Sequence, residues 1–361
     1  MKRIISCSDG TWNKPSVDQN GNIIQTNVQK IFQLIEKRDI KNDIVQIKFY
    51  DEGVGAEGSR FQQIVEGTTG EGLDIKILDA YKFIVWNYEE GDEIYLFGFS
   101  RGAYTARSLA GLIRCCGIMK SYDLMLINKA FSIYRNRDHN TADSQAAVDF
   151  KSQNSYNTNI KFVGVWDTAG ALGIPLEIFN IMNKEKYQFH DVQLSSTVEN
   201  AYQALAIDEH RKQFAPSIWT QSPSVKQYNI KQNLEQVWFT GAHSDVGGGY
   251  TEAGLSDIAL LWMIEKATST GLSLKKPENL NPNYKGPTHN SSTGVFLMDE
   301  LSPYLRPITM DDDGAKASLS PSVLQRLNDS KCNYVPENLL TNTDKSVVML
   351  KDYNIQKDSV V

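Results

Sequence analysis

The chain has 361 residues, with 37 basic and 43 acidic side chains, so its formal net charge is −6 at pH 7. Hydrophobic residues make up 41% and charged residues 22%, an ordinary globular composition that excludes a disordered chain. The mild acidity, without a cluster of Lys and Arg, excludes nucleic acid as the main partner.

The first hundred residues alternate predicted strands with predicted helices. Apolar runs predict strands at Lys2–Cys7, Ile44–Tyr50 and Glu93–Phe97, and apolar stripes at helical spacing predict helices at Asn27–Lys37 and Gly72–Tyr88. The runs are too apolar for a sheet with one face in water. They fit parallel strands that are covered on both faces.

The rest of the chain continues this alternation with longer interruptions. A helix is predicted after Ser100, strands at Ile160–Trp166 and Glu235–Thr240, and a further helix from Ile258. Strands alternating with helices predict an α/β fold with a doubly wound, mostly parallel sheet.

Three ranges fit the alternation poorly: about 120–158, 172–234 and 268–320. We expect them to be helical cap insertions over the strand ends. Within the second, Ile174–Met182 is apolar on nearly every side and is either a buried helix or a surface for an acyl chain. No linker is visible, so we expect a single catalytic domain over residues 1–345 and a C-terminal tail over 346–361.

The sharpest motif is Gly98-Phe99-Ser100-Arg101-Gly102, a Gly-x-Ser-x-Gly pattern between a predicted strand and a predicted helix. This context predicts a nucleophile elbow with Ser100 on a strained turn, where Gly98 and Gly102 avoid a backbone clash. The helix N-terminus would direct the N–H of Arg101 at an oxyanion. The alternative is a plain strand-turn-helix junction with a capping serine.

A serine nucleophile needs a general base, and His243 is the favoured histidine. It follows an apolar strand, at the sheet edge where α/β folds bind ligands. His139 and His289 lie in polar stretches, His190 lies in a predicted cap, and His210 lies in a charged run, 208–212, that we interpret as a solvated helix face. The alternative for His243 is a satisfied core or surface residue.

Asp167 is the favoured acid because it ends a predicted strand and gives the order Ser100, Asp167, His243, which is that of α/β-hydrolases. The rival is Asp245, which is only two residues from His243 in a tight loop and so is awkwardly placed to reach that imidazole. The alternative for Asp167 is a helix N-cap.

The loop after the first strand, Ser8 to Asn13, lies opposite the predicted elbow. We expect Gly10 or Thr11 to supply the second oxyanion N–H and Asp9 to brace the loop, although an Asx-turn explains Asp9 equally well. The loop also resembles the Asp-x-Asp-Gly-Thr signature of haloacid dehalogenase phosphatases. That resemblance fails because Cys7 occupies the position of the nucleophilic aspartate.

Neither the cysteines nor the N-terminus indicate a secreted protein. The four cysteines have no zinc or disulfide spacing, and no apolar run has the length of a signal-peptide core or of a membrane span, about 18 residues. We expect a cytoplasmic protein, with export by a signal-independent system left open. The sequence does not predict an oligomeric state.

Several motifs together resemble those of the bacterial and fungal α/β-hydrolases long catalogued as a domain of unknown function, whose studied branch is the phospholipase effectors of type VI secretion. The resemblance spans about residues 3–340. It is carried by Asp9-Gly10-Thr11-Trp12-Asn13, Tyr50-Asp51-Glu52-Gly53-Val54-Gly55, residues 91–107 around Ser100, Gly164-Val165-Trp166-Asp167-Thr168, Ala204-Leu205-Ala206-Ile207-Asp208-Glu209, Gly241 to Tyr250, Pro321 to Leu327 and Tyr334 to Asn338.

The resemblance implies an α/β-hydrolase fold and a catalytic triad of Ser100, Asp167 and His243. It also implies hydrolysis of lipid esters without a cofactor or metal, with transient contact to a membrane surface. The effector branch carries added membrane-interacting modules, and we expect none after the hydrolase domain of this chain.

The sequence therefore predicts a serine ester hydrolase for lipid-like esters: a phospholipase, lipase or carboxylesterase. Two alternatives from other classes stay open. One is a metal-dependent hydrolase with Asp9, Asp167, His243 and Asp245 as ligands. The other is an interaction protein without catalytic activity.

Overall fold

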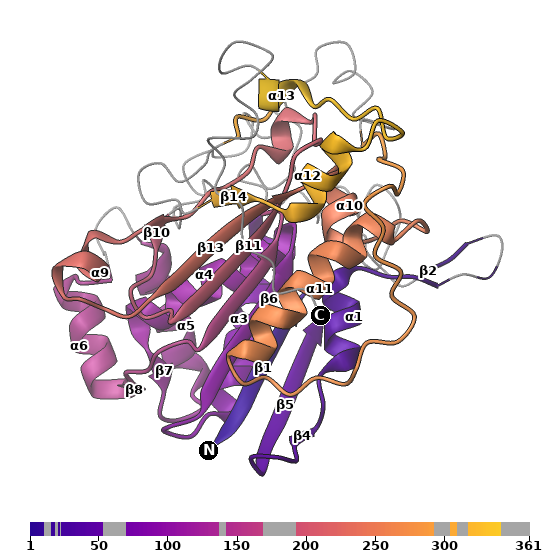
Figure 1. The fold of residues 1–361 in the computed structure, drawn as a ribbon. Helices are drawn as coiled ribbons and strands as arrows, with labels where there is room; N and C mark the ends of the chain where they lie inside the picture. The colour runs from indigo at the N-terminus through magenta and orange to yellow at the C-terminus, as the bar shows by residue number, and fades with distance from the viewer. Residues whose placement is uncertain are drawn as a thin grey trace.

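A mostly parallel sheet forms the centre of the molecule (Figure 1). The computed structural model describes residues 1–10, 16–18, 21, 23–52, 70–136, 142–168, 193–291, 304–308 and 317–340. Within them, eight strands form one sheet in the order β14-β13-β11-β9-β6-β1-β5-β4. The strands are β1 (Lys2–Ser8), β4 (Arg38–Asp39), β5 (Ile44–Asp51), β6 (Glu93–Phe99), β9 (Phe162–Trp166), β11 (Asn200–Ala206), β13 (Asn233–Phe239) and β14 (Ala317–Leu319).

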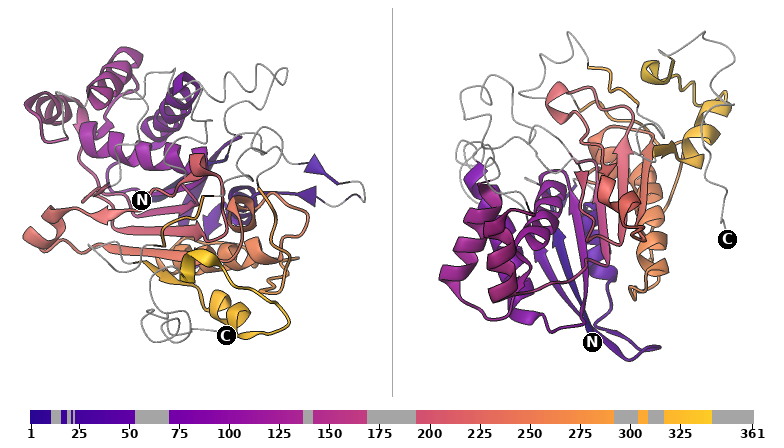
Figure 2. Two further views of the ribbon diagram at one scale, coloured as in Figure 1. Left: turned by 90° about the horizontal axis from the view of Figure 1, so that it is seen from above. Right: turned by 90° about the vertical axis from the view of Figure 1, so that its left-hand side faces the viewer.

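Helices cover both faces of this sheet (Figure 2). One layer consists of α3 (Gly70–Asn87), α4 (Arg101–Cys116), α5 (Leu124–Arg135) and α6 (Gln145–Asn154), and the other contains α1 (Asn27–Leu34) and α11 (Gly254–Ser269). Within this eight-stranded sheet, every described strand pair is parallel except β4 with β5. The predicted α/β fold with a doubly wound, mostly parallel sheet is confirmed.

The remaining described elements are short and lie between or beside these. They are β2 (Ser16–Val17), β3 (Ile23–Ile24), β7 (Ile118–Met119), β8 (Ser155–Tyr156), β10 (Gln193–Leu194), a 3-10 turn at Lys212–Phe214, β12 (Thr220–Gln221), α9 (Pro223–Gln227), α10 (His243–Gly247), α12 (Pro321–Asn328) and α13 (Glu337–Leu340).

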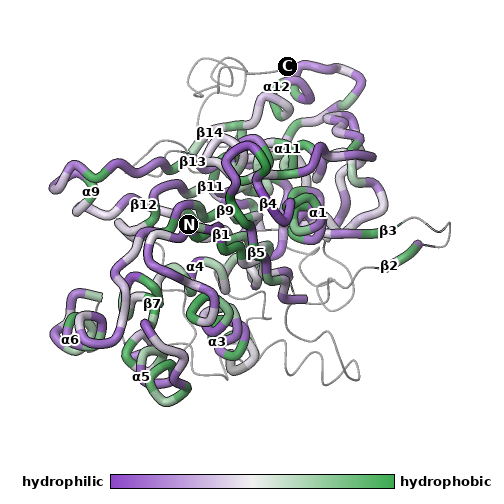
Figure 3. Tube along the Cα trace, turned by 90° about the horizontal axis from the view of Figure 1, so that it is seen from below, coloured by the Kyte–Doolittle hydropathy of each residue, from purple (hydrophilic) through white to green (hydrophobic). Residues whose placement is uncertain are grey.

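The central strands bury side chains in a hydrophobic core on each face of the sheet, because successive side chains of a strand point to opposite faces. In β6, Ile94 and Leu96 belong to the core under α3 and α4, whereas Tyr95 and Phe97 belong to the core under α1 and α11. All four side chains are fully buried. Figure 3 shows apolar residues of the strands between the two helical layers, which is why these strands appear in the sequence as continuous apolar runs.

The predicted insertions differ from the structure in three places. Within 120–158, α5 and α6 pack into the same core as α4 and so extend the helical layer. Strand β11 lies inside the predicted insertion 172–234, and β14 lies inside 268–320. Strand β11 was not predicted because it is rich in alanine and carries polar residues. One of these, Gln203, is fully buried. Ile174–Met182 and the tail 346–361 lie outside the described residues.

The chain changes direction across the sheet at β1, which has β5 on one side and β6 on the other. Such a switch point opens a crevice at the carboxyl ends of the strands, where α/β folds bind ligands. The loops after β1 and β6 begin there, and they hold the candidate residues Asp9 and Ser100. No helix within the described ranges has both the length and the apolar character that crossing a bilayer requires.

Candidate active site

Ser100 occupies a strained turn between β6 and α4. Its φ of 58° and ψ of −122° lie in a region that residues with a side chain rarely adopt, at a cost of about 1–3 kcal/mol. A Cβ on Gly98 would lie 2.3 Å from the carbonyl oxygen of Gly102, and one on Gly102 would lie 2.0 Å from that of Ser8. The Ser100 side chain makes no N-cap hydrogen bond, so the capping alternative is wrong, and the strained turn agrees with the predicted elbow.

Asp167 leaves the sheet beside Ser100. Phe99 pairs with Trp166 where β6 and β9 run in parallel, so the two residues that follow them emerge from adjacent strands at the same level. The Ser100 N–H donates to the Trp166 carbonyl at 3.1 Å. Asp167 also has a positive φ, 41°, and is fully buried. Two strained residues side by side at strand ends are typical of a functional site.

His243 begins α10, directly after the loop that follows β13. Its Nδ1 lies 2.5 Å from Oδ2 of Asp167, and its ring packs against Phe99 and Phe214 with centroid distances of 4.6 and 4.9 Å. The residue is 5% exposed, and its Nε2 has no hydrogen-bond partner in the described part of the chain. One ring nitrogen is therefore fixed by a carboxylate while the other can exchange a proton with a neighbour.

Asp245, the rival acid, faces a different histidine. Its Oδ1 lies 2.6 Å from Nδ1 of His289, and its Oδ2 accepts the backbone N–H groups of His289 at 3.0 Å and Ala242 at 2.9 Å. Asp245 thus caps α10 and holds His289. Of the two candidate acids, the one that contacts His243 is Asp167.

Sequence reasoning missed Arg306, which lies in the described segment 304–308 far along the chain from Asp167. Its side chain is fully buried. It donates to both carboxylate oxygens of Asp167, at 2.7 and 2.9 Å, and to the carbonyls of Ala206 and Phe214, at 2.9 and 2.6 Å. Arg306 lies in the predicted insertion 268–320 and in none of the motifs, so the sequence held no signal for it as a site residue.

Glu209 is the second missed residue. Its Oε2 accepts the backbone N–H of His243 at 3.2 Å, its carboxylate pairs with Arg211 at 2.8 and 2.9 Å, and Ser291 donates to it at 2.8 Å. The run 208–212, interpreted as a solvated helix face, has no α-helix and buries Glu209 completely. The motif Ala204 to Glu209 quoted for the family resemblance was the signal that could have identified it.

The charges around the imidazole oppose one another. Burial raises the pKa of Asp167, but the charge of Arg306 and the hydrogen bonds from His243 and Arg306 outweigh it, so this pKa lies well below its usual range. Burial lowers the pKa of His243, against the hydrogen bond and charge of Asp167. The pair at neutral pH is therefore a carboxylate beside a neutral imidazole, the protonation state that a general base requires.

Asp9 braces the loop after β1. Its carboxylate accepts the N–H of Gly10 at 2.6 Å and the hydroxyls of Thr26 and Tyr50 at 2.5 and 2.8 Å. Burial raises the pKa of Asp9 to about 7, against these hydrogen bonds. The expected brace agrees with these contacts.

The three expected oxyanion donors, Gly10, Thr11 and Arg101, differ in what the structure shows of them. The Gly10 N–H points to Asp9 in this structure, and Thr11 lies outside the described residues. Arg101 is the first residue of α4, so its N–H belongs to the turn that leaves Ser100. Burial lowers the pKa of the Arg101 guanidinium to about 9. Of the three expected donors, Arg101 is the one whose backbone N–H lies in the described turn that follows Ser100, and its role as a donor stays a prediction.

The four residues that the metal alternative takes as ligands do not converge on one point, because each is already hydrogen-bonded elsewhere or to another of the four. Asp9 binds Thr26 and Tyr50, Asp245 binds His289, and Asp167 and His243 bind each other. Across the described ranges, no three His, Cys, Asp or Glu side chains form a group that could hold a metal ion. The arrangement does not favour the metal alternative.

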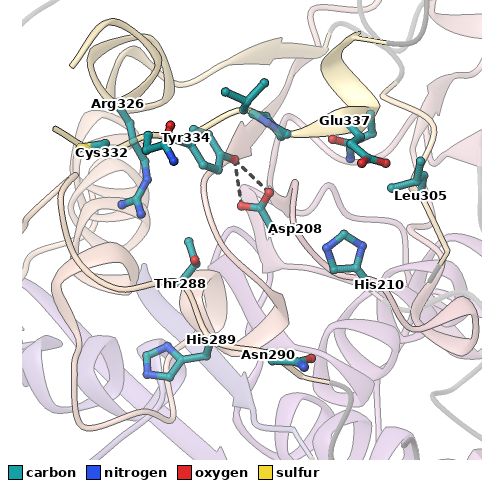
Figure 4. Close-up of a pocket in the computed structure, with 14 residues that line it drawn as sticks. Asp208, His210, Thr288, His289, Asn290, Leu305, Arg326, Cys332, Tyr334 and Glu337 are labelled. Carbon is teal, nitrogen blue, oxygen red and sulfur yellow. Dashed lines mark hydrogen bonds between the residues drawn. The ribbon is translucent and has the colours of Figure 1, made fainter. Parts of the chain in front are cut away.

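A cavity of about 730 Å³ lies next to this site (Figure 4). Figure 4 shows the Tyr334 hydroxyl directed at Asp208, to whose two carboxylate oxygens it donates at 3.0 and 2.8 Å. The lining includes His289 and Leu305, the neighbour of Arg306, but not Ser100 or His243. The cavity therefore borders the candidate site without containing it.

Comparison with known proteins relates the chain to one family of catalytic domains. The family model described as T6SS, phospholipase effector Tle1-like, catalytic domain matches residues 2–266. An uncharacterized protein of Saccharomyces cerevisiae is 29% identical over 245 residues, which are 62% of this chain and 33% of that protein. The chain spans about a third of the length of this yeast relative.

Two solved structures resemble the chain weakly. A crystal structure of an uncharacterized protein from Pseudomonas aeruginosa aligns with 79% of this chain and 49% of its own, at 18% identity and a TM-score of 0.44. The structure of the Tle1 effector bound to the VgrG spike of the type 6 secretion system aligns with 87% of this chain and 83% of its own, at 15% identity and a TM-score of 0.45. The family assignment rests on the family model, which matches most of the chain.

Proposed function

The chain belongs to the family of type VI secretion phospholipase effector Tle1-like catalytic domains, and on this premise we propose that it is a serine hydrolase of lipid-like carboxylic esters. The coarse activity, hydrolysis of the lipase or phospholipase type, follows from the family. The serine mechanism and the roles of single residues are inferred from the chemistry of the site.

The proposed reaction begins when Ser100 attacks the acyl carbonyl of the ester. His243 accepts the hydroxyl proton at Nε2 and returns it to the leaving alcohol, which leaves an acyl-enzyme on Ser100. Water, activated by the same imidazole, then releases the acid. Asp167 holds the imidazole with its proton on Nδ1 and stabilises the imidazolium that forms in each step.

The oxyanion of each tetrahedral intermediate needs hydrogen-bond donors. The Arg101 N–H at the start of α4 is the proposed first donor, and the helix dipole adds to its effect. The proposed second donor comes from the loop after β1, which Asp9 braces. Of its two candidates, Gly10 would first have to release Asp9, which leaves Thr11 as the simpler choice.

One observation carries the proposal: His243 has Nδ1 bound to a buried carboxylate and a buried Nε2 that accepts no described donor. A histidine that served only the core would use both nitrogens, because an unsatisfied buried nitrogen costs about 1–3 kcal/mol. The His243 ring also packs against Phe99, the residue before Ser100, and this contact supports the proposal that Nε2 serves Ser100.

The substrate class is proposed from the family alone. A lipid ester presents a polar carbonyl beside long apolar chains, so catalysis would involve transient contact with a membrane or micelle surface. The candidate site itself requires only an ester carbonyl, which a short-chain ester also offers.

The test is an ester hydrolysis assay on wild-type protein and on Ser100→Ala. The substrates are a series of p-nitrophenyl esters of increasing acyl length and phosphatidylcholine in mixed micelles, each with and without EDTA. We expect turnover by the wild-type protein, a fall to background in Ser100→Ala, and no effect of EDTA.

Other outcomes favour the alternatives. Activity that EDTA abolishes and Ser100→Ala keeps would favour a metal-dependent hydrolase. A folded wild-type protein that turns over no ester would favour an interaction protein.

A further inference from the structure

The carboxylate of Asp167 is held from both sides. Four donors reach it: the two terminal nitrogens of Arg306, the Ala206 N–H at 3.0 Å and Nδ1 of His243. A carboxylate with four acceptor positions filled in this way has one possible orientation. Its plane and that of the imidazole are therefore set together.

Arg306 also forms hydrogen bonds to two backbone segments that surround the imidazole. Besides Asp167, it binds the carbonyl that ends β11, at Ala206, and the carbonyl of Phe214, whose ring packs on His243. It comes from the segment 304–308, beyond the range 2–266 that the family model matches. Residues outside that range thus take part in the candidate site.

A buried carboxylate with a histidine as its sole charged partner would bind a proton on that histidine strongly. An imidazolium cannot act as a base, so such a pair would be inactive until the pH rose. A guanidinium cannot lose its proton in this range and compensates the carboxylate charge permanently. The imidazole then stays neutral, with Nδ1–H donated to Asp167.

We propose that Arg306 is a positioning residue that acts through Asp167, fixing the carboxylate in one orientation and keeping the His243 imidazole neutral and ready to accept a proton from Ser100. This inference rests on the proposed function. It adds a fourth member to the group of Ser100, His243 and Asp167.

Other charges face the same imidazole and set the direction of the effect. Asp167 follows β9, and Glu209 and Arg211, which pair with each other, follow β11. On the helix of His243 itself, Asp245 is engaged by His289. Removal of Arg306 leaves this set with one positive charge fewer, so the pKa of His243 rises and the acid limb of the pH profile moves to higher pH.

The test compares Arg306→Gln, which removes the charge, with Arg306→Lys. The lysine keeps the charge but cannot donate two parallel hydrogen bonds to the two carboxylate oxygens. The control is Arg326→Gln, at another buried arginine, which donates to the backbone carbonyls of Tyr284 and Gly286. The dependence of kcat and KM on pH is measured with a short-chain ester, and thermal unfolding reports the folded fraction of each variant.

We expect Arg306→Gln to lower kcat on the order of 100-fold with little change in KM, and to move the acid limb upward by about one pH unit or more. Arg306→Lys should have an acid limb closer in pH to that of the wild-type protein and a kcat between those of the wild-type protein and Arg306→Gln. Arg326→Gln should lower the unfolding temperature without moving the limb. An unmoved limb in a folded Arg306→Gln protein would overturn the inference.

A second measurement separates this inference from the proposed function, because it needs no turnover. In Ser100→Ala protein, NMR titration of the His243 ring gives its pKa with and without Arg306→Gln. A rise in that pKa supports the positioning role even if no ester is hydrolysed, and an unchanged pKa contradicts it whether or not the protein is an esterase.

Discussion

At the scale of single residues, the site depends on which carboxylate meets which imidazole. Two Asp–His contacts are present, Asp167 with His243 at 2.5 Å and Asp245 with His289 at 2.6 Å. The sequence favoured Asp167 over Asp245 as the partner of His243, but it did not indicate that Asp245 pairs with His289. Only the end of β9 brings Asp167 across the sheet to His243.

Asp167→Asn and Asp245→Asn should differ sharply in activity. An amide at position 167 cannot stabilise the imidazolium and leaves Arg306 without its carboxylate, so we expect kcat/KM for an ester to fall about 10⁴-fold. An amide at position 245 can still accept the Ala242 N–H, so its loss should be much smaller. Equal losses in two folded variants would contradict the assignment of the acid.

Asp9→Asn should reveal the raised pKa of Asp9. The carboxyl has a pKa of about 7 in the folded protein and about 3.9 in an unfolded chain, so the folded state binds more protons between these values. Wild-type stability therefore falls as the pH rises from about 4 to about 7. The amide can accept from Gly10 and donate to Thr26 and Tyr50, whose hydroxyls can rotate.

The free energy of unfolding of Asp9→Asn relative to wild type should thus increase with pH over this window, by at most about 1.4 kcal/mol per pH unit. Urea unfolding of both proteins at pH 5 and pH 8 measures it. A difference between the two proteins that is the same at both pH values would show that Asp9 does not titrate there.

At the scale of elements, the elbow requires that β1, β6 and α4 approach closely. Gly102 lies in the first turn of α4, against the backbone of Ser8 at the end of β1. The sequence could indicate this contact because both glycines of the motif and both flanking elements agree. Strands β1, β5, β6, β9 and β13 could likewise be predicted, since each contains a short, mostly apolar run.

Gly102→Ala should destabilise the protein and displace Ser100. The added Cβ would meet a backbone oxygen at 2.0 Å, which cannot move without shifting the helix or the strand, so we expect a loss of about 3 kcal/mol in the free energy of unfolding. The matched control is Gly91→Ala. A Cβ on Gly91 would meet open space, but the φ of 94° is strained for alanine, so we expect the free energy of unfolding to fall by about 1 kcal/mol. Urea unfolding and ester turnover distinguish them: Gly91→Ala should stay active. Equal stability of the two variants would argue against the close approach.

Other elements gave no usable pattern in the sequence. Strand β11 carries the buried Gln203, whose side chain accepts from Arg107 at 3.1 Å and donates to the Ser217 carbonyl at 3.1 Å. Arg107 lies far away in the chain and Ser217 lies in a different segment, so nothing in the sequence indicates that this glutamine is buried. Arg306 was missed for the same reason, because a buried charge is explained only by its partner.

At the scale of the whole molecule, the sheet order explains how distant residues meet. Ser100, Asp167, Glu209 and His243 follow β6, β9, β11 and β13, four consecutive strands of the sheet. Because these strands are parallel, their carboxyl ends lie along one edge and deliver the four residues in order. For this reason the sequence could predict that Ser100, Asp167 and His243 lie at one edge of the sheet, whereas Arg306 follows none of these strands.

The central claim, that Ser100 is an activated nucleophile, is tested most directly by labelling the purified protein with a fluorophosphonate. Trypsin releases Phe83–Arg101, a peptide whose single serine is Ser100, so mass spectrometry locates the label without ambiguity. We predict a label on this peptide in the wild-type protein that is lost in Ser100→Ala and in His243→Ala. A folded wild-type protein that stays unlabelled, with and without detergent, or a label that persists in His243→Ala, would contradict the account.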